Sequence, residues 1–288
     1  MPELPEVETI KNDLKKMVCG QEILKVEIHN PKVIREPEPA KFKKLLEGQT
    51  IKDISRRAKL LIIELSNGQF LTVHLKMTGQ LVLRQRALST SFEQAKQVEE
   101  PVSPEGPSKS RVAFILSKGI LDFNDSRLFA ELRVVNDWKK LKFVQALGPE
   151  PFDLSFEEFN RMLSKKKTKI KPLLMDQTFV SGIGNLYASE ILFRSGIHPE
   201  APAQKLTDDK KQALFKEMIS VLKGAVKHGG SSVDDYVRVS GKPGNYVPFH
   251  RVYGRSGKPC FVCHTPIKRI AQGGRGTFFC SKCQRIEK

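Results

Sequence analysis

The sequence predicts an α+β protein of two domains, and three features of its 288 residues support this prediction. Short runs rich in β-branched residues fill the stretch from Ile23 to Val135, which is typical of antiparallel sheets. Amphipathic helical patterns dominate after residue 153, and two Cys-x-x-Cys pairs lie near the end of the chain. We therefore expect an N-terminal antiparallel β-sandwich with a leading helix, followed by a helical domain that ends in a cysteine-rich β-hairpin.

The leading helix is predicted from the first 20 residues. Pro5 suits the first turn of a helix, where a backbone N–H has no helical partner. Apolar residues follow at helical spacing up to Val18, and Gly20 is a suitable C-terminal stop. The stretch MPELPEVETI also brings two prolines and three carboxylates to the tip of the chain. At the start of a helix, these acidic residues lie near the positive end of the helix dipole.

Antiparallel strands without intervening helices are expected next. The tripeptides SNG and SKG separate apolar runs and are typical of hairpin turns. The runs are ILKVEIHN, KLLIIELSNGQFLTVHL, QLVLR, RVAFILSKGILDFND and AELRVV. The stretch from Gln85 to Ser110 is rich in Ser, Glu, Pro and Lys, and we interpret it as a long mobile insert between strands.

The second half of the chain predicts helices. The prolines and glycine of LGPEPFD indicate a hinge, and Ser155 and Glu158 form a capping-box pattern that opens a short helix. Further helices are predicted in KPLLMDQ, over Asn185–Arg194 after the turn SGIG, and over Thr207–His228. The expected segments are a β-sandwich domain over 1–146, a hinge over 147–153, a helical domain over 154–245 and a hairpin segment over 246–288.

The chain carries 49 Lys and Arg against 32 Asp and Glu, a formal net charge of +17. An excess of this size attracts polyanions, and nucleic acid is the leading candidate. A membrane surface is one alternative partner, and a basic protein without a polyanionic partner is another interpretation. No run approaches the roughly 18 apolar residues of a membrane span, and no signal-peptide pattern is present. We therefore expect no membrane partner.

Four of the five cysteines stand in two pairs, Cys260 with Cys263 and Cys280 with Cys283. Pairs at this separation match a tetrahedral zinc site, and four thiolates leave no open position for catalysis. We expect one structural Zn²⁺, which would supply the stability that so short a segment lacks. Two disulfides or idle thiols are the alternative, although the cysteine pattern fits a reducing cytosol. Cys19 is expected to be a small buried residue.

The residues between the two pairs, TPIKRIAQGGRGTFF, predict a β-hairpin with a glycine-rich turn. Arg269 and Arg275 flank that turn. A guanidinium near the tip of a hairpin is well suited to binding a phosphate. A solvated surface arginine is the alternative interpretation.

Several motifs are informative because of their order. They are PELPEVET, Arg57–Ala58–Lys59, HLKMTG, NDSRLF, SGIGNLYASE, GKPG and the two Cys-x-x-Cys pairs. Along nearly the whole chain, this pattern closely resembles the bacterial formamidopyrimidine-DNA glycosylase family, which excises 8-oxoguanine. The resemblance implies a helix-two-turns-helix domain and a zinc finger. It also implies a bifunctional DNA glycosylase and AP lyase of base excision repair. Such an enzyme would be a monomer in the bacterial cytoplasm, associated with the nucleoid, acting on double-stranded DNA with oxidised purines.

The resemblance assigns the chemistry to the N-terminus. It implies that Met1 is removed and that Pro2 is the Schiff-base nucleophile, since with Met1 attached Pro2 has no free amine. A secondary amine that attacks the sugar forms an iminium ion, which promotes β- and δ-elimination. The resemblance makes Glu3 the proton donor and Glu6 a supporting residue. Favourable placement at a helix N-terminus is the alternative for both carboxylates.

Three further residues match a phosphate-binding set of the family. Lys59 and Arg275 are implied to act as proton donors during elimination and as phosphate ligands. Lys59 would also favour the neutral amine of Pro2, because like charges repel. Asn185 follows the turn SGIG at a predicted helix start, where backbone N–H groups attract a phosphate. An ordinary N-cap is the alternative for Asn185.

The family fills the space left by an extruded base with a methionine, an arginine and a phenylalanine. Met77, Arg127 and Phe129 match these positions, and burial in the core is the alternative for Met77 and Phe129. Lys76 and Ala130 stand where the family often has glycine, and they could alter the geometry of these loops. The stretch GKPGNYVPFHRVYGR is predicted to include the loop that closes over the extruded base.

Two other functions remain open from the sequence. An endonuclease VIII-like glycosylase for oxidised pyrimidines would share the amine chemistry, because lesion preference is a property of the pocket. A non-catalytic zinc-containing protein that binds damaged DNA fits the charge and the cysteines equally well. Pro2, Glu3 and Lys59 separate the enzymes from the binder, which does not need them. A basic RNA-binding protein would carry an RNA motif, and none is recognisable.

Overall fold

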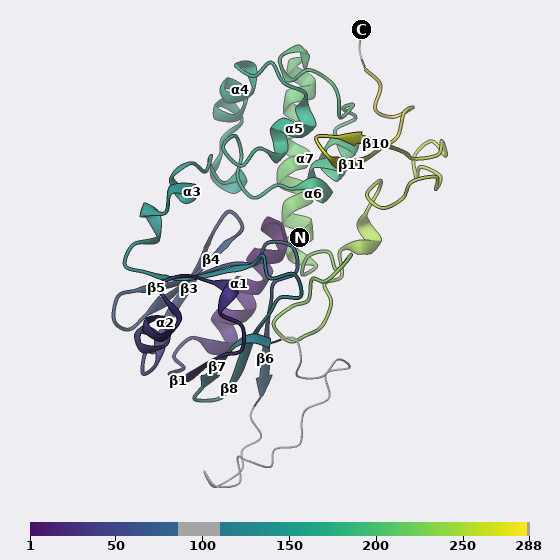
Figure 1. Ribbon diagram of the computed structural model, residues 1–288. Helices are drawn as coiled ribbons and strands as arrows, with labels where there is room; N and C mark the ends of the chain where they lie inside the picture. The colour runs from purple at the N-terminus through teal and green to yellow at the C-terminus, as the bar shows by residue number, and fades with distance from the viewer. Residues whose placement is uncertain (86–109, 287–288) are drawn as a thin grey trace. The chain divides into compact units, whose positions relative to one another are not determined.

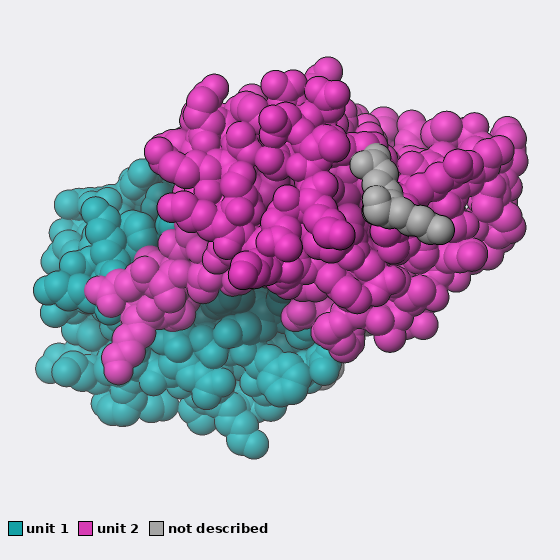
Figure 2. All heavy atoms as spheres, turned by 90° about the horizontal axis from the view of Figure 1, so that it is seen from above, with its two compact units in different colours: residues 1–2, 6–140, 231–244 teal, residues 3–5, 141–230, 245–288 magenta. Residues whose placement is uncertain are grey.

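The structure is a computed structural model that describes residues 1–85 and 110–286 (Figure 1). Most of the predicted insert over 85–110 therefore lies outside the described residues. The chain divides into two compact units, coloured separately in Figure 2. Unit 1 comprises residues 1–2, 6–140 and 231–244, and unit 2 comprises residues 3–5, 141–230 and 245–288. The finer predicted division, with its hinge and separate hairpin segment, stays a prediction.

Two sheets form most of unit 1 (Figure 1). The first has the strand order β1 (Ile23–Ile28), β7 (Ser110–Leu116), β8 (Gly119–Asn124) and β6 (Gln80–Gln85). The second has the order β2 (Ile34–Glu36), β9 (Glu131–Val135), β5 (Phe70–His74), β4 (Leu60–Leu65) and β3 (Ile51–Arg57). Neighbouring strands run antiparallel, except that β2 pairs in parallel with β9. The predicted α+β class with an antiparallel sandwich is confirmed.

Helix α1 (Leu4–Val18) supplies an apolar stripe to the core of unit 1. Val7, Ile10 and Leu14 are buried and belong to one apolar cluster with residues of both sheets. Burying such side chains contributes roughly 1.5–3 kcal/mol each. The predicted stop is present, because Gly20 has a φ of 81°. The helix begins with Leu4 and Pro5 in unit 2 and continues in unit 1 from Glu6.

The prediction of strands without an intervening helix is wrong. Helix α2 (Pro39–Leu46) follows β2 and buries Phe42 in the core. Its eight residues are too few for a helical period to stand out, although Glu38 caps its N-terminus. Strand β3 was also not predicted, because a bulge leaves its buried residues, Ile51 and Ile54, three positions apart.

Helices and one hairpin build unit 2. The helices are α3 (Lys142–Gln145), α4 (Phe156–Ser164), α5 (Ile170–Met175), α6 (Asn185–Arg194) and α7 (Asp208–Lys227). The hairpin consists of β10 (Lys268–Gln272) and β11 (Arg275–Phe279). Single 3₁₀ turns in the two units lie at Pro31–Val33, Trp138–Lys140, Pro151–Asp153, Ala203–Lys205 and Val247–Phe249. Helix α6 is buried along most of its length and contacts α5, α7 and β11, so it forms the centre of this unit. Within residues 1–85 and 110–286, every helix is too short or too polar to span a bilayer.

The capping box predicted at the start of α4 is present. The Ser155 hydroxyl accepts the N–H of Glu158 at 3.2 Å, and the Glu158 carboxylate accepts the N–H of Ser155 at 3.1 Å. We expect Ser155→Ala to lower the free energy of unfolding of unit 2 by about 1 kcal/mol, because the first turn loses this acceptor. Ser164→Ala is the matched control at the other end of the helix and should cost less, since alanine favours helix. Urea unfolding followed by circular dichroism measures both, and equal losses would contradict the prediction.

Candidate active site and zinc centre

The buried carboxylate of Glu3 lies at the N-terminus of α6. Its Oε2 accepts hydrogen bonds from the N–H groups of Gly184 at 2.7 Å and Tyr187 at 3.4 Å. Its Oε1 accepts one from the N–H of Leu186 at 2.9 Å. These groups have no partner within their own helix, and the helix dipole favours a negative charge at this end. The acidic N-terminus therefore caps a helix far along the chain, in addition to beginning α1.

The turn SGIG allows this close approach. A Cβ on Gly184 would lie 2.4 Å from the Cδ of Glu3, and one on Gly182 would lie 2.7 Å from a methyl group of Leu4. Gly182 also has a φ of 91°, and its carbonyl accepts the N–H of Leu4 at 2.9 Å. Any larger side chain at these two glycines would displace the N-terminal residues.

Pro2 and Glu6 belong to unit 1, and both are buried. The Glu6 carboxylate accepts the N–H of Ser231 at 2.9 Å. Burial, followed by the charge of Glu6, raises the pKa of Tyr236. Glu6 thus anchors the start of the segment 231–244, which contains the predicted GKPG loop. Whether it also supports the chemistry stays a prediction.

Lys59 is buried directly after a tight turn between β3 and β4. The turn residue Ala58 has a φ of 52°, which is uncommon for a residue other than glycine. Burial lowers the pKa of His74 to about 3. The positive charges of Lys76 and Lys59 act in the same direction, and the negative charge of Glu131 opposes the shift. Lys59 therefore lies close to the end of β5, where the HLKMTG motif begins.

Met77 and Phe129 are exposed at 42% and 51% of their surface. The alternative that they are core residues is therefore wrong. The guanidinium carbon of Arg127 lies 5.1 Å from the centre of the Phe129 ring, within the range of a cation–π contact. Unit 1 thus brings together the arginine and the phenylalanine of NDSRLF on an exposed loop.

Asn185 is not the N-cap of α6, since Gly184 occupies that position. Its side chain instead joins α6 to two other elements. The Oδ1 atom accepts a hydrogen bond from Nζ of Lys171 at 2.6 Å, and Nδ2 donates to the carbonyl oxygen of Gly276 at 3.0 Å. Asn185 therefore connects the start of α6 both to α5 and to the hairpin.

Lys171 is a residue of this site that sequence reasoning missed. It is 1% exposed, and its Nζ also donates to the hydroxyl of Thr277 at 2.7 Å. Burial lowers its pKa to about 8, with Arg275 acting in the same direction and Glu3 opposing. The signal was a lysine inside the apolar stretch IKPLLM, which we interpreted as a helix alone.

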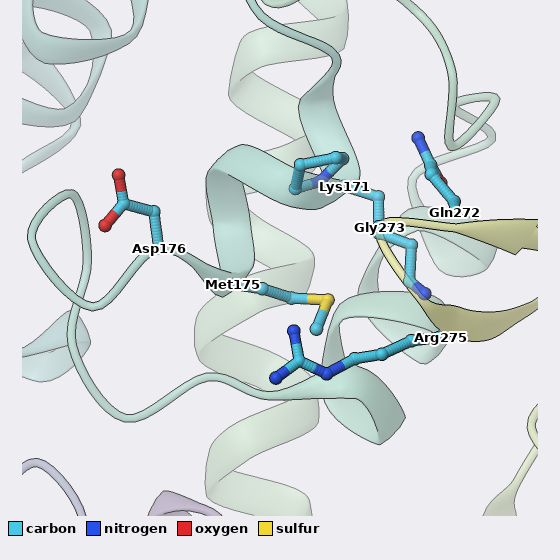
Figure 3. Close-up of a pocket in the computed structure, with 7 residues that line it drawn as sticks. Lys171, Met175, Asp176, Gln272, Gly273 and Arg275 are labelled. Atoms are coloured by element: carbon cyan, nitrogen blue, oxygen red, sulfur yellow. The ribbon is translucent and has the colours of Figure 1, made fainter.

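Lys171 and Arg275 line one pocket between α5 and the turn of the hairpin (Figure 3). Met175, Asp176 and Gln272 also line it. In Figure 3, the Arg275 side chain runs from β11 toward α5. The predicted hairpin with a guanidinium next to its turn is thus present. Its pocket, about 230 Å³ in volume, is lined by two basic side chains and one acidic side chain, Asp176.

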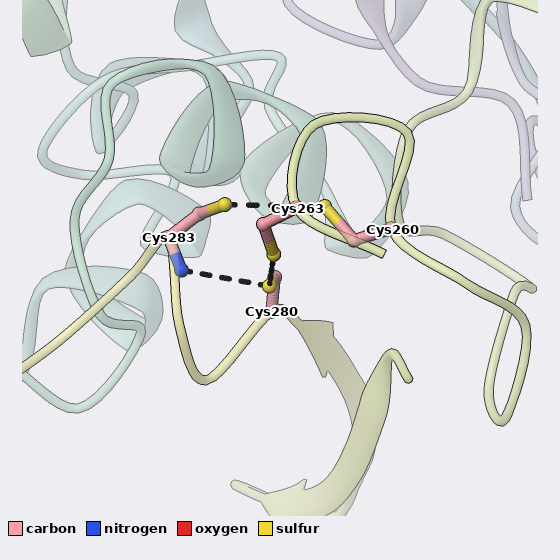
Figure 4. Close-up of side chains that lie close together, drawn as sticks. All are labelled: Cys260, Cys263, Cys280 and Cys283. Carbon is pink, nitrogen blue, oxygen red and sulfur yellow. Dashed lines mark hydrogen bonds between the residues drawn. The ribbon is translucent and has the colours of Figure 1, made fainter. Parts of the chain in front are cut away.

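The four paired cysteines form one cluster (Figure 4), in which the sulfur atoms lie within 4.8 Å of one another. Cys260 and Cys283 have their sulfurs 3.9 Å apart, and those of Cys263 and Cys280 are 3.4 Å apart. These separations are too long for disulfides, whose sulfurs are about 2.05 Å apart. They are close to the roughly 3.8 Å edge of a tetrahedron with Zn–S bonds of about 2.3 Å. The four thiolates fit one structural zinc ion, which confirms the predicted cofactor.

Comparisons with known proteins match nearly the whole chain. Residues 1–132 match the model of the formamidopyrimidine-DNA glycosylase N-terminal domain, and residues 147–237 match that of its H2TH domain. Residues 257–286 match a zinc finger found in FPG and IleRS. The formamidopyrimidine-DNA glycosylase of Solibacter usitatus is 38% identical over 99% of this chain and 100% of its own. That of Bacillus cereus is 36% identical over 99% of both chains.

Solved structures are similar over the same extent. The crystal structure of the MutM (FPG) protein from Thermus thermophilus is 35% identical, covers 100% of both chains and gives a TM-score of 0.84. The Lactococcus lactis Fpg in complex with DNA containing an abasic site is 33% identical and gives a TM-score of 0.86. It covers 98% of this chain and 99% of its own.

The matched family models and the similar solved structures together define the class of protein, DNA repair enzymes with a zinc finger. The chain belongs to the formamidopyrimidine-DNA glycosylase family. It is a DNA glycosylase of base excision repair.

Gly184→Ala tests the contact between Glu3 and α6. The new Cβ would displace the carboxylate that holds the N-terminal residues, and we expect excision activity to fall on the order of 100-fold, the typical cost of a displacement of about 1 Å near an active site. Gly224→Ala in α7 is the matched control, since its Cβ would meet its nearest neighbour, Tyr246, at an ordinary 3.6 Å. The control should keep activity and stability. Single-turnover excision rates and thermal unfolding measure both variants, and an active Gly184→Ala protein would contradict the role of this contact.

Lys171 should make stability depend on pH. Its pKa is lower in the folded protein than the roughly 10.4 of an unfolded chain, so the unfolded chain binds more protons between about pH 8 and pH 10. The stability of the wild type relative to Lys171→Met should therefore rise with pH across this window and stay constant below it. Lys169→Met, at an exposed neighbouring position, is the control. Urea unfolding from pH 7 to 10 with zinc present measures the trend, and a flat difference would contradict it.

Proposed function

We propose that this glycosylase is bifunctional and cleaves the DNA strand through the N-terminal amine of Pro2. The observation that supports this is the binding of Glu3 by three backbone N–H groups of α6, because Glu3 directly follows Pro2. A chain terminus is normally mobile, and here its third residue is held in place. The proposal requires removal of Met1, since an amide nitrogen is not a nucleophile.

In the proposed reaction, the Pro2 nitrogen forms a bond to C1′ of the damaged nucleoside. The bond from C1′ to the base breaks, and the base leaves with the electron pair and takes up the proton that the Pro2 nitrogen releases. Glu3 donates a proton to the ring oxygen O4′, and ring opening produces an iminium ion between C1′ and nitrogen. The iminium ion acidifies C2′–H, and loss of that proton expels the 3′ phosphate. Loss of the C4′ proton then expels the 5′ phosphate.

We assign the contacts with these phosphates to Lys59 and Arg275, which also donate protons to the leaving oxygens. Lys171 adds positive charge to the pocket that Arg275 lines. Asn185 keeps its predicted role as a third ligand of the DNA phosphates, and it also holds the hairpin, because its amide bonds both Lys171 and the backbone of Gly276. The net charge of +17 supports a binding surface for the DNA backbone.

We propose that Met77, Arg127 and Phe129 fill the space that an extruded base leaves in the duplex. Exposed apolar side chains inserted between base steps kink DNA, and Arg127 can hydrogen-bond to the orphaned base. The proposed substrates are oxidised purines, 8-oxoguanine and formamidopyrimidines. In support, a Lactococcus lactis Fpg mutant, 34% identical to this chain, was solved with DNA containing Fapy-dG. The loop that includes GKPG would close over the base.

The same proposal covers partners and location. We propose that the protein binds double-stranded DNA as a monomer in the bacterial cytoplasm, at the nucleoid, without a membrane partner. We propose the predicted roles for the segments: a catalytic sandwich over 1–146, a hinge over 147–153, a DNA-binding helical domain over 154–245 and a zinc hairpin over 246–288. Within the third segment, residues 231–244 pack with unit 1.

Borohydride trapping tests the amine mechanism. Processed protein is incubated with a duplex that holds one 8-oxoguanine opposite cytosine, and borohydride reduces any iminium ion to a stable protein–DNA adduct. We expect an adduct whose cross-linked peptide maps to Pro2, because this residue supplies the amine. Pro5→Ala is the matched control and should still form the adduct, since Pro5 has no free amine in either state.

The outcomes separate the competing functions. Trapping on an oxidised pyrimidine but not on 8-oxoguanine would favour the endonuclease VIII-like activity. Trapping on an abasic site alone would indicate a lyase without glycosylase activity. No adduct on any of the three, from zinc-loaded protein without Met1 that binds duplex tightly, would leave a damaged-DNA binder.

A further inference from the structure

Two loops of unit 1 carry the three residues proposed to enter the duplex. The first wedge loop, residues 75–79, joins β5 to β6 and carries Met77. The second wedge loop, residues 125–130, joins β8 to β9 and carries Arg127 and Phe129. Because β5 pairs with β9 and β6 pairs with β8, both loops cross from one sheet to the other at neighbouring positions.

The two wedge loops meet at the carboxylate of Asp125, which is 0% exposed. Its Oδ1 accepts hydrogen bonds from the hydroxyl of Thr78 and from the N–H of Arg127, the latter at 3.2 Å. Its Oδ2 accepts the N–H of Ala130 at 2.7 Å. The Thr78 oxygen in turn accepts the N–H of Arg127 at 3.3 Å. One buried carboxylate therefore joins the first loop to residues on both sides of Phe129.

The wedge loops are also tightly packed and conformationally strained. A Cβ on Gly79 would lie 2.5 Å from the carbonyl oxygen of Leu75 and 3.0 Å from the Cβ of Ala130. Lys76 and Leu128 have φ values of 50° and 57°, and each directly precedes an exposed apolar residue. Left-handed conformations of such residues persist where surrounding bonds hold them in place. The hydrogen bonds of Asp125 are suited to do so.

We propose that Asp125 and Thr78 form a positioning pair that fixes the two wedge loops relative to each other. This inference rests on the proposed role of Met77, Arg127 and Phe129. Asp125 and Thr78 are buried, so they act through the loops and do not themselves enter the DNA. The pair keeps the exposed side chains of both loops at a constant separation, so that they enter the duplex together. Without it, each loop would relax independently, and the base would be extruded more slowly.

Thr78→Val tests the pair, because valine has the shape of threonine without its hydroxyl. Two single-turnover rates are compared: excision of 8-oxoguanine from a duplex, and cleavage of a single-stranded oligonucleotide with an abasic site, which has no base pair to open. Losing a hydrogen bond to a buried carboxylate should slow duplex excision roughly tenfold or more and change single-strand cleavage by no more than about twofold. Thr78→Ser keeps the hydroxyl and should restore the duplex rate.

Asp125→Asn is the second variant, since an amide nitrogen cannot accept the bond that one carboxylate oxygen accepts now. It should reproduce the duplex defect in protein with unchanged zinc content and melting temperature.

Met77→Ala separates the positioning proposal from the wedge proposal on which it rests. A duplex defect in Met77→Ala, but in neither folded pair variant, would overturn the positioning pair and leave the wedge. Equal losses on both substrates would indicate a general structural role and also overturn it. A Met77→Ala protein with a normal duplex rate would show instead that the wedge proposal itself fails.

Discussion

The binding of the Glu3 carboxylate by the first N–H groups of α6 determines where the N-terminus of this protein lies. The two partners are more than 180 residues apart in the chain. The negative charge meets the positive end of a buried helix, and a glycine at position 184 leaves room for the carboxylate. The prolines of PELPEVET limit the conformations of the adjoining backbone. An ordered terminus is a condition for any chemistry at Pro2, and it follows from this contact.

Helix α6 extends the same arrangement to the zinc hairpin. Asn185 at its start bonds the backbone of Gly276 in β11. Glu190, further along the helix, accepts the N–H groups of three successive residues at 251–253, just ahead of the first cysteine pair. Burial raises the pKa of Glu190, and the three donors oppose that shift. Backbone N–H groups at the start of α6 thus hold the N-terminus, and two of its polar side chains, Asn185 and Glu190, hold the hairpin and the segment that leads to the metal.

The sequence allowed us to predict the features that depend on residues close together in the chain. The hairpins, the capping box, α7 and the zinc ligands follow from the spacing of apolar residues, serine and cysteine within short windows. The family motifs located Glu3, but no local rule predicts that its acceptor atoms bind α6, because this contact joins distant parts of the chain. Lys171 was missed because its burial depends on Asn185 and Thr277, which fold against it from other elements. Helix α2 was missed because tertiary packing of Phe42, rather than helix length, stabilises it.

The four thiolates of the zinc site make the hairpin sensitive to the oxidants that create the proposed substrates, the oxidised purines. Agents that oxidise guanine also convert thiolates to sulfenic and then sulfinic acids, and the later steps are not reversed by ordinary cellular thiols. Two of the four cysteines, Cys263 and Cys283, are only partly buried, so solvent reaches part of each residue. Oxidation of one ligand would release the ion and loosen the hairpin that carries Arg275 and bonds Asn185. Under strong oxidative stress, the rate of repair would therefore depend on the supply of zinc and of reducing equivalents as well as on the amount of enzyme.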